Sequence, residues 1–142
     1  MSLSTITETN WNGVQLPAVA SPVADQAERI MAALGPTTGG VPKVDEKSLS
    51  RYYRYLTARL SFPFTAHYPE PRSSLEEVEH RCTVLELLDP SKYICDEFDG
   101  IYCKTRKGKY EINLPLTELR VSENSPNSQL IEDYWYWFWN WR

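Results

Sequence analysis

The spacing of apolar residues predicts a helix over residues 45–60. Five of them fall within about 100° of one another on a helical wheel: Leu49, Tyr52, Tyr53, Leu56 and Leu60. Asp45 is suited to cap the start of this helix. The segment Ser61-Phe62-Pro63-Phe64 ends it, because a residue before proline is pushed out of the helical conformation. We expect an extended segment through Tyr68 to follow.

From residue 82 onward the pattern changes to short strands separated by turn residues. The predicted strands cover residues 82–88, 101–104, 109–114 and 116–121. Asp89-Pro90, Asp99-Gly100, Lys107-Gly108 and Pro115 separate them. Four or five short strands, with no alternation of strand and helix, predict a small curled barrel in a mainly β domain with flanking helices.

The C-terminal segment is dominated by aromatic residues, which occupy seven of the eight positions from Tyr134 to Trp141. We favour a helix that closes the domain with a buried stripe of Leu130, Tyr134, Trp137, Phe138 and Trp141. Trp139 and Tyr136 then lie on the same side as Glu132 and Asp133. The alternative is a strand, in which the four tryptophans at positions 135, 137, 139 and 141 would share a face. Such a stripe is typical of core packing, and the surplus aromatics indicate an interaction surface.

The N-terminal region differs from the rest in composition. Residues 1–44 hold four of the ten prolines and few charges, which is typical of a chain that buries too little apolar surface to fold alone. A short helix over residues 22–34 fits the spacing of its apolar residues, and Gly35-Pro36 would stop it. We therefore expect a flexible arm over residues 1–44 and a folded domain over residues 45–142.

Length and charge narrow the function classes. The chain has 142 residues, is 42% hydrophobic and carries a formal net charge of −4, so it can form a core without disulfides or a structural metal. An acidic protein is poorly suited to bind nucleic acids, and cations are its natural charged partners. No membrane-spanning apolar run or secretory signal is found, and three cysteines cannot all pair. These features predict a cytoplasmic protein with reduced thiols.

Acidic residues gather in the second half of the chain. Residues 66–100 contain nine carboxylates and only three Lys or Arg, and the densest cluster is Asp96-Glu97-Phe98-Asp99-Gly100. Hard dications such as Ca²⁺ prefer several oxygen ligands, which a turn can bring together. An EF-hand is excluded, because counting from Cys95 places Arg106 where a bidentate Glu is required. The alternative is an ordinary hairpin turn in a solvated acidic loop.

Other chemistry has weaker support in the sequence. A zinc site from His80, Cys82, Cys95 and Cys103 would have irregular spacing, and neither histidine lies in a catalytic motif, so no enzyme is predicted. Residues 104–110 form a basic hairpin flanked by tyrosines. It could contact phosphates, or its lysines could protect a sheet edge.

A set of short motifs, in order, covers residues 51–142. They are Arg54-Tyr55-Leu56, Leu60-Ser61-Phe62-Pro63-Phe64, Cys82-Thr83-Val84-Leu85, Asp99-Gly100-Ile101, Arg106-Lys107-Gly108-Lys109-Tyr110-Glu111, Leu114-Pro115-Leu116, Leu119-Arg120-Val121, Asn127, Glu132-Asp133-Tyr134 and Trp137-Phe138-Trp139-Asn140. In this order the motifs resemble the bacterial calcium-binding protein family typified by cyanobacterial CcbP.

The resemblance implies a small SH3-like barrel, preceded by one helix and closed by the aromatic helix, that binds Ca²⁺ through surface acids without EF-hands. It implies Asp89, Asp96, Glu97 and Asp99 as first-choice ligands. It implies Glu132 and Asp133 as second-choice ligands. The sequence therefore predicts a non-enzymatic calcium buffer or sensor. The alternative is an SH3-like interaction module that binds a protein or a nucleic acid through the C-terminal aromatics or the basic hairpin.

Overall fold

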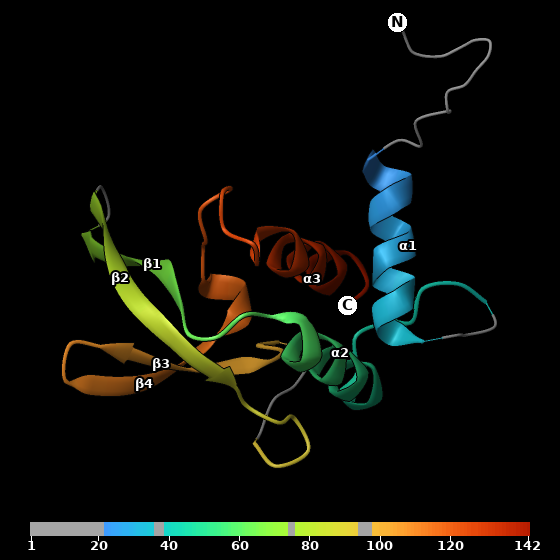
Figure 1. Ribbon diagram of the computed structural model, residues 1–142, viewed down its shortest axis with the longest axis horizontal. Helices are drawn as coiled ribbons and strands as arrows, with labels where there is room; N and C mark the ends of the chain where they lie inside the picture. Colours follow the sequence, from blue (N-terminus) through green and yellow to red (C-terminus); the bar gives the residue numbers. More distant parts are fainter. Residues whose placement is uncertain (1–21, 36–38, 74–75, 94–97) are drawn as a thin grey trace, which may run out of the picture.

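The computed structural model describes residues 22–35, 39–73, 76–93 and 98–142. Helices α1 (Pro22–Leu34) and α2 (Glu46–Arg59) precede four strands, and a short 3₁₀ turn, η2 (Leu116–Glu118), leads to the C-terminal helix α3 (Ser128–Asn140). Figure 1 shows α1 at one end of the molecule and the turn between β3 and β4 at the other.

Helix α2 begins where its capping residues predict. The Asp45 side chain accepts a hydrogen bond of 2.8 Å from the N–H of Ser48, and the Ser48 hydroxyl accepts one of 2.9 Å from the N–H of Asp45. These two bonds satisfy donors that a helix start otherwise leaves unpaired. Leu49, Tyr52 and Leu56 are buried, which confirms the predicted apolar stripe.

The four strands form one antiparallel sheet in the order β1–β2–β3–β4. Their bounds are β1 (Phe64–Ser73), β2 (Glu76–Leu87), β3 (Tyr102–Lys107) and β4 (Tyr110–Pro115). A shift in register between Val84 and Glu86 changes the alternation of side chains along β2. Leu87 is therefore buried with Cys82 and Val84, while Glu86 is exposed.

The predicted barrel is wrong, because the described strands leave the sheet open. Leu116–Glu118 forms η2, where the sequence predicts a further strand, and the Leu119 N–H bonds to the Leu116 carbonyl at 3.1 Å. Among the described residues, the segment that follows η2 pairs with β1 at Arg120, through two backbone hydrogen bonds of 2.8 Å with His67. With helices of 13, 14 and 13 residues, the fold is mixed α/β rather than mainly β.

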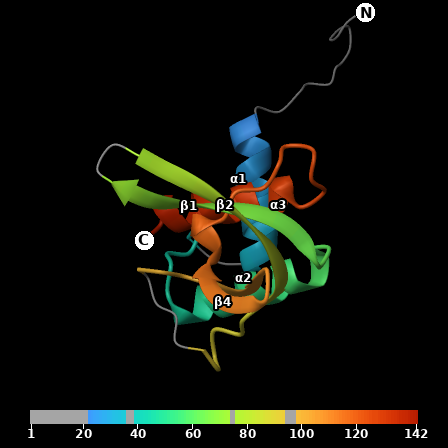
Figure 2. The same ribbon diagram turned by 90° about the vertical axis from the view of Figure 1, so that its left-hand side faces the viewer.

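Helix α3 covers the core, as the aromatic pattern predicts. Ile131, Tyr134, Trp137 and Phe138 are buried on it. The two views agree that α3 lies between the sheet and α1 (Figures 1 and 2). At the start of the helix, the buried Asn127 side chain accepts a bond from the Ser61 N–H at 2.9 Å and donates one to the Ser61 carbonyl at 3.0 Å.

The N-terminal region contributes to the same core. The expected helix is present as α1, and its Ile30 and Leu34 are fully buried beside α2 and α3. Residues 1–21 lie outside the described part, and the division of the chain at residue 44 stays a prediction. No helix in the described ranges is both long and apolar enough to cross a lipid bilayer.

Candidate functional site

The loop between β2 and β3, residues 88–101, carries the first-choice ligand acids and is called the acidic loop below. Figure 1 shows it leaving the end of β2 beside α2. The structure describes both of its ends, which hold Asp89 and Asp99. Asp96 and Glu97 lie outside the described residues.

Asp89 is held by a local turn at the start of the acidic loop. Its Oδ1 accepts hydrogen bonds from the Ser91 N–H at 2.9 Å and from the Ser91 hydroxyl at 2.8 Å. Both bonds favour the ionised carboxylate and lower the pKa of Asp89 below its usual value, and the positive charges of Lys92 and Arg54 lower it further. Asp89 is thus an oriented anion at neutral pH.

Asp99 lies at the other end of the acidic loop and is exposed. Its Oδ2 accepts a hydrogen bond of 2.8 Å from the hydroxyl of Tyr102, the first residue of β3. The Tyr102 ring packs against the Tyr93 ring with centroids 5.2 Å apart, so the first half of the loop contacts the start of β3. The structure therefore orients an acid at each end.

The acidic loop is anchored to helix α3 where it enters the core. The Ile101 N–H donates a hydrogen bond of 2.9 Å to the Tyr134 hydroxyl, and both residues are fully buried. Gly100 has φ +70° and lies so close to α3 that a Cβ there would contact the Tyr134 hydroxyl and Cε1 of Phe138. Only glycine fits this backbone position without strain.

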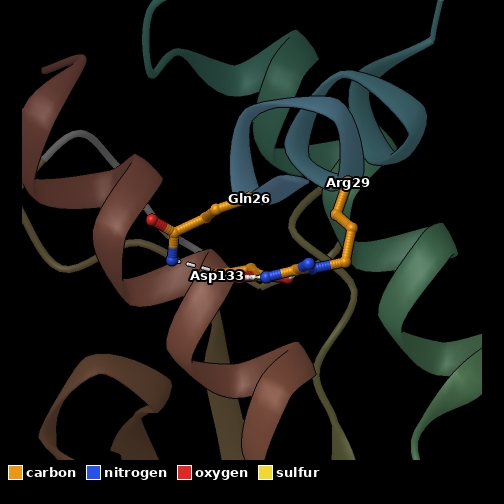
Figure 3. Close-up of polar contacts among 3 residues, drawn as sticks. All are labelled: Gln26, Arg29 and Asp133. Atoms are coloured by element: carbon orange, nitrogen blue, oxygen red, sulfur yellow. Dashed lines mark hydrogen bonds and ion pairs between the residues drawn. The ribbon is translucent and has the colours of Figure 1, made fainter. Parts of the chain in front are cut away.

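The second acidic pair, Glu132 and Asp133, is divided between two environments. Glu132 is exposed, whereas Asp133 is 3% exposed, contrary to the prediction that it lies on the outer side of α3. Figure 3 shows Arg29 and Gln26 of α1 reaching the Asp133 carboxylate. Arg29 forms an ion pair with it at 2.6 Å, and Gln26 adds a hydrogen bond of 3.1 Å.

This ion pair gives Asp133 a structural partner that the sequence does not reveal. Both of its carboxylate oxygens are engaged, Oδ2 by Arg29 Nε and Oδ1 by Arg29 Nη2 and Gln26 Nε2. The hydrogen bond raises the pKa of Arg29. A buried carboxylate is tolerated where a cation and a further donor satisfy it, so Asp133 joins α1 to α3.

The other candidate sites from the sequence are the zinc ligands and the basic hairpin, and of the zinc ligands Cys95 lies outside the described residues. No three of the His, Cys, Asp and Glu side chains in the described ranges form a group that could hold a metal. Cys82 and Cys103 are free thiols buried in the sheet, and burial raises the pKa of both. In the basic hairpin, Lys107 Nζ lies 2.6 Å from His80 Nδ1 and Lys104 is 3.7 Å from Glu111.

Comparison with known proteins adds one decisive observation. The model of the CcbP family, described as calcium binding, matches residues 43–138 and so spans α2, the sheet, the acidic loop and most of α3. The chain belongs to the CcbP family of calcium-binding proteins. The predicted resemblance is confirmed. Among curated proteins, none matches the chain.

Two solved structures share the fold. The crystal structure of Anabaena CcbP has 19% sequence identity and a TM-score of 0.61, and the match covers 86% of this chain and 94% of that one. A structure titled "Calcium binding protein in the calcium-binding form" has 18% identity and a TM-score of 0.60, and the match covers 84% and 94%. Helix α1 precedes the residues that the CcbP family model matches.

Sequence reasoning about this CcbP family member missed the residues that connect the acidic loop to the helices. Tyr134 was assigned only to the buried stripe, and Gly100 only to a turn. Arg29 and Gln26 were not singled out, although they lie three residues apart and thus on one side of a helix. Their partner, Asp133, is more than 100 positions away along the chain, so no local pattern could show the contact.

Proposed function

We propose that this protein binds Ca²⁺ through the carboxylates of the acidic loop, without an EF-hand and without catalysing a reaction. The observation that supports this proposal is the match to a calcium-binding family model over residues 43–138, which include the whole acidic loop and its four acids. Asp89, Asp96, Glu97 and Asp99 are the proposed ligands. The exposed Glu132 of α3 is a second-choice ligand.

The donor chemistry of the described acids fits this ion. Ca²⁺ takes six to eight oxygen ligands at flexible geometry, and carboxylates and backbone carbonyls are its usual donors in proteins. Asp89 is ionised at neutral pH and oriented by Ser91, and Asp99 is exposed and oriented by Tyr102. Bound there, Ca²⁺ would neutralise the negative charge concentrated in the loop.

Asp133 has a different role in this proposal. Arg29 lies 2.6 Å from its Oδ2, so a cation at this buried carboxylate would have to displace the guanidinium. We therefore assign Asp133 to the connection between α1 and α3, and the calcium-binding oxygens to the acidic loop.

Calorimetric titration of CaCl₂ into chelator-treated protein tests the proposal. We expect saturable heat from the parent protein and an affinity at least about tenfold lower for Asp96→Asn/Asp99→Asn, because calcium affinity follows the number of charged ligands. Glu28→Gln removes one exposed charge from α1 and serves as the control, with parental affinity expected. Absence of heat, or equal affinity of the parent and the double variant, would refute it.

The same titration followed by NMR locates the site. We expect amide shifts at residues 88–93 and 98–102 on adding Ca²⁺. A buffer would show only these, whereas a sensor would also show shifts along α3, to which Tyr134 connects the loop. Shifts confined to α1 and the start of α3 would place binding at the Arg29–Asp133 contact and exclude the acidic loop. A cytoplasmic location stays a prediction from the sequence.

A further inference from the structure

A second surface feature, separate from the acidic loop, lies beside α3. A cleft of about 490 Å³ opens between this helix and the segment that contains η2 and the residues after it. Figure 1 shows η2 next to α3. The apolar part of the cleft wall is formed by Pro69, Leu119, Val121, Ile131 and Trp135. Its volume lies within the range of clefts that bind small ligands or short peptide segments.

Carboxylates dominate the charged groups around this cleft. Glu118 comes from η2, Glu123 from the turn before α3 and Glu132 from α3 itself, and all three are exposed. The one basic residue in the lining, Arg120, forms an ion pair with Glu79 at 3.3 Å, and Glu79 is outside the lining. The cleft is therefore complementary to a positively charged ligand.

Trp135 provides an aromatic surface at the same place. Its side chain is 47% exposed, although a large apolar ring is normally buried. Within the described residues, no Lys or Arg is found over the Trp135 ring, whereas the Arg142 guanidinium lies 4.8 Å from the centroid of the Trp139 ring. The same helix thus already shows the contact between an indole and a cation that Trp135 could make with a ligand.

We propose that this cleft binds a segment of a partner protein that carries a Lys or Arg side chain next to an apolar residue. The cation would lie over the Trp135 ring with the carboxylates of Glu118, Glu123 and Glu132 around it, and the apolar residue would contact Pro69 and Val121, which are half-buried. Partly desolvated cation–aromatic contacts of this kind stabilise complexes and are common at the centre of interfaces. The proposal does not depend on calcium binding at the acidic loop.

NMR titration of the ¹⁵N-labelled full chain in EGTA provides the test. The probe is a pool of capped hexapeptides whose central positions contain Leu, Lys and Arg, and the matched pool contains Glu in place of Lys and Arg. We expect the basic pool to shift the Trp135 indole resonance and the amides of residues 117–121 and 128–135. The acidic pool should leave these resonances unchanged.

Three variants separate the cleft from a general charge effect. Trp135→Ala should weaken binding at least about fivefold, and Glu132→Gln about threefold. Tyr110→Ala removes an aromatic side chain that is 75% exposed at the hairpin turn, and should retain the parental affinity. Because Trp135 is half-exposed, its replacement should leave the fold intact, which circular dichroism verifies. Equal shifts with both pools, shifts outside the cleft only, or parental affinity in Trp135→Ala would overturn the proposal.

Discussion

The Tyr134 hydroxyl on α3 accepts a hydrogen bond of 2.9 Å from the backbone N–H of Ile101, where the acidic loop enters β3. The next residue back along α3, Asp133, forms the ion pair with Arg29 of α1. Two adjacent residues of one helix therefore hold the acidic loop on one side and the N-terminal helix on the other. This arrangement makes α3 the element that connects the proposed calcium site to the rest of the chain.

Replacing Tyr134 with Phe should loosen the end of the acidic loop. The variant keeps the ring contacts with Tyr52 and Phe138 but leaves the buried Ile101 N–H without its acceptor. An unsatisfied buried donor costs about 1–3 kcal/mol, so we expect a loss of that size in urea denaturation and faster hydrogen exchange at Ile101. Tyr136→Phe, on the half-buried side of the helix, should change stability by less than about 0.5 kcal/mol. If the Ile101 amide exchanged at the same rate in the variant as in the parent protein, the hydrogen bond to Tyr134 would be contradicted.

Substitutions at two glycines distinguish crowding from backbone strain. Gly100 and Gly108 both have positive φ, +70° and +61°, so alanine is strained at either position. At Gly100 the new methyl group would also meet Tyr134 and, at 2.7 Å, Cε1 of Phe138, whereas nothing lies within 4 Å at Gly108. We expect about 1 kcal/mol of destabilisation for Gly108→Ala and a larger loss, about 2–4 kcal/mol, for Gly100→Ala. If urea denaturation gave the same loss of unfolding free energy for both variants, the close approach of Gly100 to α3 would not add to the cost of the alanine.

Removing the guanidinium of Arg29 should detach α1 from α3. Arg29→Met keeps an unbranched apolar stem but leaves the buried Asp133 carboxylate with Gln26 as its remaining partner from α1. We expect a loss of about 1–3 kcal/mol and faster hydrogen exchange along α1. Glu28→Gln, on the exposed side of the same helix, is the control. The pair Arg29→Met/Asp133→Leu should recover much of the loss, and an additive loss would argue against a direct contact.

Ser91 should control the ionisation of Asp89. The backbone N–H and the hydroxyl of Ser91 are the two main causes of the lowered pKa. Ser91→Ala removes the hydroxyl and keeps the N–H, so it should raise the pKa of Asp89 part of the way toward the ordinary value of about 3.9. A carboxylate with a lowered pKa contributes stability above its ordinary pKa, and this contribution is lost as the pH falls through the lowered value. NMR titration of the Asp89 carboxyl carbon measures the effect.

Lys92→Gln provides the comparison for Asp89. The Lys92 charge is a smaller cause of the lowered pKa than the Ser91 hydroxyl bond, so this variant should shift the Asp89 titration less than Ser91→Ala does. A larger shift in Lys92→Gln would mean that charge, rather than the turn, sets the ionisation of Asp89.

The sequence by itself determined the elements that depend on local contacts. Asp45 and Ser48 lie three residues apart and cap α2 together, and the turn residues before β3 and between β3 and β4 are neighbours along the chain. The aromatic helix was predictable because its buried residues recur at helical spacing. The order of the motifs also predicted the family.

The tertiary structure alone decided the contacts between distant segments. The sheet does not close into a barrel, because Leu116–Glu118 forms η2 although its residues are compatible with a strand. Asp133 is buried because Arg29, 104 positions earlier, supplies a cation, and no local pattern distinguishes it from the exposed Glu132. Burial of a charge depends on which partner the fold brings to it, and that partner is set by the packing of whole helices.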